Sequence, residues 1–399
     1  MRCARRSPIS PRPPEPAPPA ARRSRGAAAA ARAGAALLLA LAAGAAAPDA
    51  VAQERWLLQG LLDAQYWNTD GGSRLLARNE GDRSGYGNLR LWAAGDFAPG
   101  LQGFAMASAY SGDACTSDVC DSDIDLEQAW LRYTTTGTSR FMVEAGRILT
   151  PIGDFPKRYL SSTNPLIDVP SDYSVDYPEG IKLGGFFPHA DVTVAAVNLP
   201  LYADWYAPQP AKSYRPMLGA GWTPMVGLRF AAFATQGTYL GEQADASLPT
   251  GESWQDFDQS AYGMEVQFSR GHFELHGQLT LSAYEAPGFA ERARGKTYWV
   301  EPRYTFTPRL YAALRVGQND YPYIMPIYGT TWIASNSRVA DVEAGVGVNV
   351  LPGLIVKASY RRDKWWVPTG LESLLPAGHA FAVAASWKFD LRDLVQTPH

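Results

Sequence analysis

The stretch HFELHGQLTLSAY, residues 272–284, alternates apolar and polar side chains for a dozen residues. Apolar side chains stand at positions 273, 275, 279, 281 and 283, with polar side chains at nearly every position between them. A β-strand rises about 3.3 Å per residue and points successive side chains to opposite faces, so this segment would separate an apolar face from a polar one over roughly 40 Å. Strands of soluble sheets are typically about 5 or 6 residues long. Whether the apolar face contacts a protein core or lipid has to be decided from the rest of the chain.

The same alternation recurs along the 399 residues of the chain. It predicts sixteen strands, at residues 56–67, 85–98, 101–111, 124–135, 139–149, 179–187, 190–198, 214–223, 226–237, 260–270, 271–283, 296–306, 309–320, 337–350, 354–366 and 378–389. Every second connection is a tight turn, such as Pro99-Gly100 or Arg270-Gly271, and the connections between these turns are long. This rhythm is typical of a bacterial outer-membrane barrel, whose closure removes the sheet edges that lipid cannot satisfy.

The two faces of the predicted strands have consistent compositions. One face is apolar, as in Leu89 and Leu91 or Val342 and Val346, and the other carries charged and amide side chains. No apolar run after residue 52 is long enough for a transmembrane helix. A soluble two-sheet sandwich is the alternative, but it would not need alternating short and long connections. We therefore expect an all-β fold, a transmembrane antiparallel β-barrel of about 16 strands.

The first 52 residues differ from everything after them. Eight arginines precede the run AGAALLLALAAGAAA, which ends near Ala50-Val51-Ala52. A basic region, a short apolar core and a small-residue end predict a secretory signal peptide at residues 1–52, cleaved before Gln53. A membrane anchor is the alternative, but the run is short and built mainly of alanine. Residues 53–389 would then form the barrel, and residues 390–399 a short periplasmic tail.

The net charge of the chain and its cysteines limit the classes of partner and the cellular compartment that fit the sequence. The chain has 36 basic and 39 acidic residues, and loss of eight arginines and two acids with the leader leaves 28 and 37, a net charge of −9. This balance disfavours a nucleic-acid partner. Cys115 and Cys120, in GDACTSDVCDSD, are predicted to form a loop disulfide in an oxidising compartment. The acids around them could hold calcium but lack the glycine and terminal glutamate of a calcium loop, which favours a solvated acidic loop.

Signals for catalysis or metal binding are weak. His272, Glu274 and His276 share one strand face, but the two histidines would lie about 13 Å apart, too far to ligate one zinc ion. No histidine lies two residues before a serine, and no nucleophile elbow, zinc-protease motif or phosphate loop is present. We expect no metal, no cofactor and no enzymatic activity; an outer-membrane barrel enzyme remains a less favoured alternative.

The longest connection, from Thr150 to Tyr177, is too long and too rich in Pro, Asp, Ser and Tyr to be only a turn between two strands. The segment GRILTPIGDF at 146–155, with a long loop and then YPEGIKLGGFF at 177–187, resembles the porin family that includes the phosphate-selective porins. The resemblance implies that this third long loop folds into the lumen and narrows it. It also implies diffusion of small hydrophilic solutes or ions through a water-filled pore, and a homotrimer in outer-membrane lipid.

Charged residues of the loop and the wall are the candidates that tune this pore. In the loop they are Asp154, Lys157, Arg158, Asp168, Asp172 and Asp176. In the predicted pore wall they are Asp63, Arg90, Arg132, Arg229, Glu265, Glu274, Glu301, Arg303, Arg315, Asp341, Glu343, Lys357 and Arg361. An acidic constriction favours cations, whereas arginines facing acids across the lumen would set up a transverse field that sorts polar solutes. The selectivity predicted is cation-leaning or mixed.

A second function is compatible with the same barrel. The long outer loops, such as 238–259, could serve binding or adhesion if the lumen were plugged. Solute flux separates the two functions.

Overall fold

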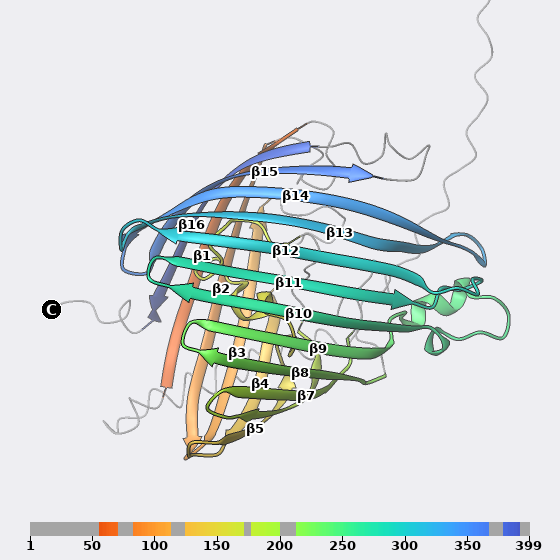
Figure 1. Cartoon of the computed structure of the whole chain (residues 1–399), viewed down its shortest axis with the longest axis horizontal. Helices are drawn as coiled ribbons and strands as arrows, with labels where there is room; N and C mark the ends of the chain where they lie inside the picture. Colours follow the sequence, from red (N-terminus) through yellow and green to blue (C-terminus); the bar gives the residue numbers. More distant parts are fainter. Residues whose placement is uncertain are drawn as a thin grey trace, which may run out of the picture.

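The structure is a computed structural model that describes residues 56–70, 83–112, 124–170, 177–199, 213–366 and 378–391 (Figure 1). Sixteen strands in these ranges form one closed antiparallel barrel, in which each strand pairs with its neighbours in the chain and β16 pairs with β1. The fold class predicted from the sequence is thereby confirmed.

The first half of the barrel contains β1 (Trp56–Thr69), β2 (Arg83–Ala98), β3 (Leu101–Gly112), β4 (Ile124–Thr134), β5 (Arg140–Arg147), β6 (Glu179–Phe186), β7 (Ala190–Val197) and β8 (Arg215–Met225). The second half contains β9 (Leu228–Thr238), β10 (Asp258–Arg270), β11 (Phe273–Tyr284), β12 (Ala293–Thr305), β13 (Leu310–Tyr328), β14 (Thr331–Leu351), β15 (Leu354–Trp366) and β16 (Gly378–Asp390). Short 3-10 helices lie in two connections, η2 (Phe155–Arg158), η3 (Glu242–Ser247) and η4 (Trp254–Asp256). No described helix is long and apolar enough to cross a membrane.

The strand bounds agree with the sequence prediction to within three residues except in β13 and β14. Residues 321–336, predicted as a long loop, instead continue both strands to a tight turn at Gly329, which has a φ of 54°. Pro322 and Pro326 are unusual within strands, because proline cannot donate a ladder hydrogen bond. β12 pairs with β13 only as far as Asp320, so the hairpin beyond this point has a free edge that tolerates both prolines.

Tight turns join the strands at the left end of the barrel in Figure 1, and the long connections lie at the other end. Gly353 shows why a turn here requires glycine. Its φ is 80°, and a Cβ atom at this position would lie 2.2 Å from the backbone oxygen of Lys388. A side chain at position 353 would therefore clash with the neighbouring strand as well as strain the backbone.

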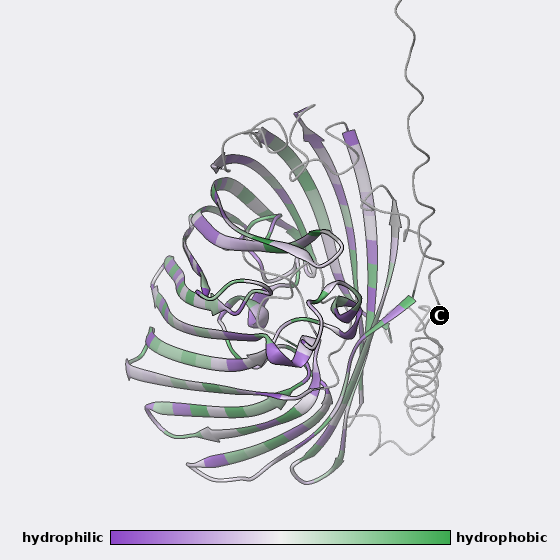
Figure 2. Cartoon of the chain, turned by 90° about the vertical axis from the view of Figure 1, so that its right-hand side faces the viewer, coloured by the Kyte–Doolittle hydropathy of each residue, from purple (hydrophilic) through white to green (hydrophobic). Residues whose placement is uncertain are grey.

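The outer surface of the barrel is apolar and the interior is charged, the reverse of a soluble protein. Val342, Val346 and Phe381 point outward and are 43%, 47% and 56% exposed, whereas Arg315, Glu343 and Lys357 point inward and are at most 2% exposed. Figure 2 shows the resulting alternation of polar and apolar bands along the strands. Lipid requires this arrangement, since it offers no partner to a charged group.

The long connections at one side of the barrel form a packed unit, which we call the outer cap. It consists of Tyr239, Leu240, Ala244, Leu248, Trp254, Phe257, Tyr284, Ala286, Ile324 and Trp332, all buried. The indole nitrogen of Trp332 donates to the backbone oxygen of Ser247 at 2.7 Å, which joins the β13–β14 hairpin to the loop after β9. The extended hairpin therefore serves as one wall of the cap.

Substitution of Val346 by arginine tests the outward face. A charge in the middle of the apolar belt should lower the free energy of unfolding by about 2–4 kcal/mol, because lipid cannot solvate it. Urea titration of the barrel refolded in lipid vesicles measures this change, with Val346→Ala as the control. Equal stability of the Arg and Ala variants would mean that this face does not meet lipid.

Candidate functional site: the lumen and its inner loop

The connection between β5 and β6 is described at residues 148–170 and 177–178, which fold back into the barrel and which we call the inner loop. A hydrogen bond of 2.9 Å from the amide of Ile148 to the carbonyl of Pro178 closes its base. The segment is apolar enough to be buried, since Ile148, Ile152 and Phe155 are at most 3% exposed. Gly153, with a φ of 91°, turns the chain into η2.

Apolar contacts press the inner loop against three sides of the wall. Ile148 and Ile152 pack against a cluster on β7–β9 that includes Met217 and Phe233. Tyr159 and Leu160 pack against Leu61, Trp92 and Met106 on β1–β3. Ile167 packs against Trp67 and the alanines Ala380, Ala382 and Ala384 on β1 and β16. The loop thus spans the lumen rather than lining one side of it.

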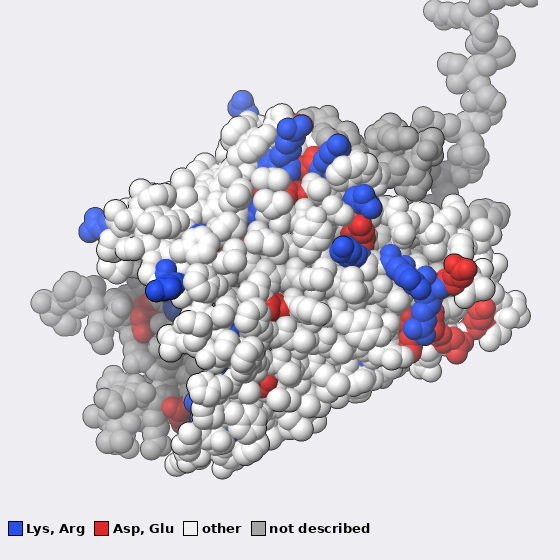
Figure 3. Space-filling model, in the orientation of Figure 1, with Lys and Arg blue, Asp and Glu red and all other residues white. Residues whose placement is uncertain are grey.

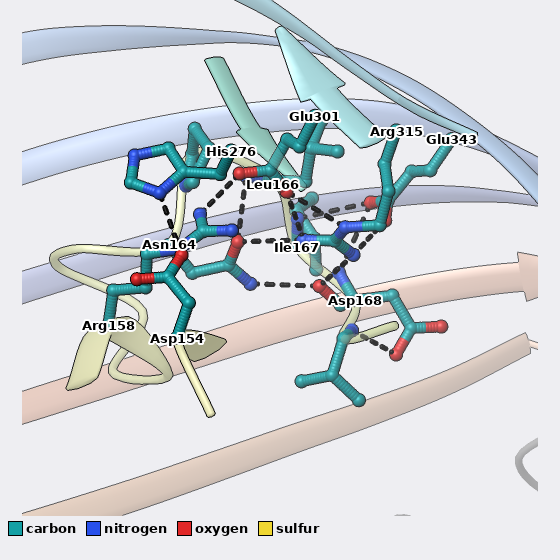
Figure 4. Close-up of polar contacts among 12 residues, drawn as sticks. Asp154, Arg158, Asn164, Leu166, Ile167, Asp168, His276, Glu301, Arg315 and Glu343 are labelled. Atoms are coloured by element: carbon teal, nitrogen blue, oxygen red, sulfur yellow. Dashed lines mark hydrogen bonds and ion pairs between the residues drawn. The ribbon is translucent and has the colours of Figure 1, made fainter. Parts of the chain in front are cut away.

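Asp154 attaches the start of the loop to β10 and β11. Its carboxylate accepts hydrogen bonds from the Gln267 amide and from Nδ1 of His276, the latter at 2.7 Å, and it pairs with Arg158 at 3.2 Å (Figure 4). Burial alone would raise the pKa of Asp154, but the hydrogen bond from His276 and the charge of Arg158 outweigh burial and hold the pKa below its usual value. The carboxylate is therefore ionised and compensated.

Arg158 is the second attachment point and combines charge with stacking. Its guanidinium pairs with Glu301 on β12 and lies 5.1 Å from the ring centroids of both Phe155 and Trp299. A guanidinium beside two aromatic rings gains cation–π energy in addition to its ion pair. Lys157, one residue earlier, has instead an exposed side chain.

Arg315 on β13 holds the far side of the loop and is itself fully buried. It donates to the Asp168 carbonyl at 2.9 Å, to Asn164 Oδ1 at 3.0 Å and to Glu301 at 2.8 Å (Figure 4). Glu343 on β14 accepts the backbone amides of Ile167 and Asp168, each at 3.1 Å. Arg315 and Glu343 thus form hydrogen bonds with backbone groups of the loop that would otherwise be buried without a partner.

Lys357 and Arg361 on β15 complete this side. The Lys357 ammonium donates to the carbonyls of Ser161, Asn164 and Leu166, at 2.5, 2.6 and 3.1 Å. Arg361 pairs with the Asp168 carboxylate at 2.5 Å and with Asp363 at 2.9 Å. Lys357 therefore fixes the loop through three backbone groups at once.

A cluster of tyrosines fixes the end of the loop to β2 and β4. The Tyr177 hydroxyl donates to Glu127 at 2.9 Å and contacts the Tyr159 hydroxyl at 2.8 Å, and Glu127 also pairs with Arg90 at 3.0 Å. Burial and the charge of Glu127 raise the pKa of Tyr159 to about 12. Asp63 on β1 accepts from Ser161 and pairs with Arg90 at 3.5 Å.

The remaining wall charges also form ion pairs on the same or nearby strands. Arg132 and Lys182 flank Glu144; Arg229 lies 2.8 Å from Asp191 and 3.7 Å from Glu265; Arg303 lies 3.3 Å from Glu274. Asp341 is buried on the lumen side of β14. The described wall therefore shows local ion pairing in place of separate basic and acidic faces across the lumen.

The structure brings nearly all the described candidate residues into contact with the inner loop or with one another. The predicted loop residues Asp172 and Asp176, and the predicted disulfide Cys115–Cys120, lie outside the described residues. Six further residues belong to this site although they were not predicted from the sequence: Glu127, Glu144, Lys182, Asn164, Tyr159 and Tyr177. Arg132 was predicted because it lies at an inward-facing position of a strand, and Glu144 and Lys182 lie at such positions as well. Tyr159 and Tyr177 lie in a loop, where no alternation indicates the direction of a side chain.

No family model matches the sequence, and no curated protein matches it. Solved structures do resemble the fold. The anion-selective porin of Comamonas acidovorans is 12% identical, with 84% of this chain and 99% of that chain covered and a TM-score of 0.53. OmpF of Salmonella typhi, in complex with daunomycin, is 11% identical, with 84% and 97% covered and a TM-score of 0.54. OmpT, an outer membrane protein of Vibrio cholerae, is 11% identical, with 84% and 97% covered and a TM-score of 0.52.

At such low identity the likeness shows the fold alone. The chain has the fold of bacterial outer-membrane barrels, porins among them.

Replacement of Lys357 by methionine should loosen the inner loop without opening the barrel. Three loop carbonyls lose their donor, and each unsatisfied buried acceptor costs about 1–3 kcal/mol. Hydrogen exchange at the amides of Ile167 and Asp168 should speed up by roughly tenfold or more. Arg309→Met, at an exposed position in the tight turn between β12 and β13, is the control. Unchanged exchange in Lys357→Met would contradict the anchoring role.

Proposed function

We propose that the protein is an outer-membrane porin, through which small hydrophilic solutes or ions diffuse passively past the inner loop. The observation that carries the proposal is the lumen itself: a wall of charged side chains surrounds an inward-folded loop, inside a barrel with an apolar exterior. A hydrated, charged lumen is what a diffusion pore requires. The similarity of the fold to the anion-selective porin of Comamonas acidovorans and to OmpF supports this proposal.

Weak, mixed selectivity is proposed for this pore. Of the loop carboxylates, Asp154 is compensated by Arg158 and His276, and Asp168 by Arg361. Lys157 is the loop charge with an exposed side chain among the described residues. A strong cation preference would have to come from Asp172 and Asp176, and strong anion preference is disfavoured because most described wall cations have acidic partners.

Non-enzymatic function is part of the proposal. Among the described residues, His276 bonds Asp154, His379 pairs with Asp70, His189 bonds a carbonyl and His272 lies near the Tyr304 ring, and no hydrogen bond joins any of them to a serine, threonine or cysteine side chain. A hydrolase of the nucleophile–base type needs one of them beside a hydroxyl or thiol. We further propose a cleaved signal peptide, from the composition of residues 1–52, and a homotrimeric assembly, from the porin resemblance.

A plugged barrel that binds a partner through its outer surface is the second candidate. The inner loop contacts strands on every side of the lumen, from β1 and β2 through β7–β9 to β15. The outer cap adds an ordered platform at the end with long loops. Both features suit a closed, ligand-binding barrel.

Planar-bilayer recording of residues 53–399 separates these functions. The porin proposal expects ohmic channels with a reversal potential close to zero in a salt gradient. Lys157→Glu should shift that potential toward cation preference, because it reverses the exposed loop charge. Arg270→Glu, a reversal outside the lumen at the turn end of β10, is the control. A folded barrel without conductance would favour the plugged alternative.

A further inference from the structure

Five basic residues form a patch on the outward face of β12, β14 and β15, at the end of the barrel with the long loops. They are Arg294 and Lys296 on β12, Arg338 on β14, and Arg362 and Lys364 on β15. All five side chains are exposed and lie on the same face as the lipid-facing Tyr298, Val342 and Tyr360. The side chains at the positions between these residues point into the lumen instead.

The register of the strands places these charges close together. Lys296, Asp320 and Arg338 occupy one row across β12, β13 and β14, so the two cations lie about 10 Å apart. Lys364 and Arg362 follow in the next two rows on β15, opposite Ala340 and Val342. Figure 3 shows blue side chains over this part of β12–β15, beside a broad uncharged surface over the middle of the barrel.

Most of this charge is uncompensated. Asp320 pairs with Arg338 at 2.7 Å, and the Arg338 side chain is still 52% exposed. No ion pair links a described carboxylate to Arg294, Lys296, Arg362 or Lys364. A cluster of exposed cations with a single acid repels itself unless it has an anionic partner.

Aromatic side chains and the apolar belt fix the patch at the lipid interface. The Lys364 ammonium lies 4.7 Å from the Trp366 ring, Arg338 5.9 Å from the same ring, and Lys296 5.9 Å from Tyr298. Tyrosine and tryptophan mark the level of lipid head groups. Lys296 and Arg338 thus lie four residues nearer the long loops than the outward-facing Val300 and Val342 of their own strands, whereas Arg362 lies opposite Val342, next to the apolar belt.

The patch occupies one sector of the barrel and is absent from another. At the same end of β8, β9 and β10, the outward positions are Pro216, Gln236 and Asp258, none of them basic. A general electrostatic requirement of the interface would have spread the cations evenly. Their concentration on neighbouring strands instead fits one partner with several negative charges.

We propose that this patch binds the phosphorylated saccharide head group of lipopolysaccharide in the outer leaflet. The end of the barrel with the long loops faces the cell exterior in outer-membrane barrels, so the patch meets the outer leaflet. A head group with several phosphates matches cations spread over about 10 Å, where a phospholipid offers one. The binding is independent of whether the lumen conducts.

The test measures binding of purified diphosphoryl lipid A to the full barrel in zwitterionic detergent, by native mass spectrometry. Wild-type protein should retain at least one lipid A molecule, more weakly at high salt. The variant with Lys296, Arg338, Arg362 and Lys364 replaced by glutamine should bind about tenfold or more weakly, because each cation near the head group contributes. The double variant Arg362→Gln, Lys364→Gln leaves the Arg338–Asp320 pair intact and should show an intermediate loss.

The control replaces Arg270 and Arg309, which lie at the turn end, by glutamine and should bind like wild type. Heat-dependent mobility on gels checks that every variant is folded. Three results would overturn the proposal. The first is that the folded patch variants bind lipid A as tightly as wild type, and the second is that wild type binds dephosphorylated lipid A as tightly as diphosphoryl lipid A. The third is that phosphatidylglycerol displaces bound lipid A as effectively as free lipid A does.

Discussion

Closure of the sheet between β1 and β16 is the constraint on which the rest of the structure depends. The two strands pair from Gln59 and Asp390 to Thr69 and Ala380, and this seam leaves no open edge in lipid. Closure also divides every strand into an apolar outer face and an enclosed inner face. Because the inner face is polar, its charges have to find partners inside the barrel.

The inner loop supplies many of those partners. Burying an ion away from water costs several kcal/mol, and only close partners and full hydrogen bonding offset that cost. Arg315 meets both conditions, because it contacts two acids of the wall and two groups of the loop. The loop and the wall are therefore one polar network, and removal of either part would leave buried charges in the other.

Alternation of side chains predicted almost the whole barrel, because lipid on one side and water on the other impose a period of two on every strand. The prediction failed at Pro322 and Pro326. Proline is disfavoured where its position must donate a hydrogen bond to a neighbouring strand, but this edge of the hairpin has no neighbouring strand. The same parity selected the wall charges of the site. It could not select their partners, since contacts such as Tyr177 with Glu127 depend on how the loop crosses the lumen.

Lys357 has a consequence for the order in which the molecule assembles. Its ammonium binds carbonyls that precede it in the chain by 191 to 196 residues. The loop therefore cannot reach its final position until β15 has been synthesised, inserted and paired, long after the loop itself has been made. Contacts of such sequence separation form late, because a long chain segment must first be brought together. The centre of the barrel is thus completed at the same stage as its wall.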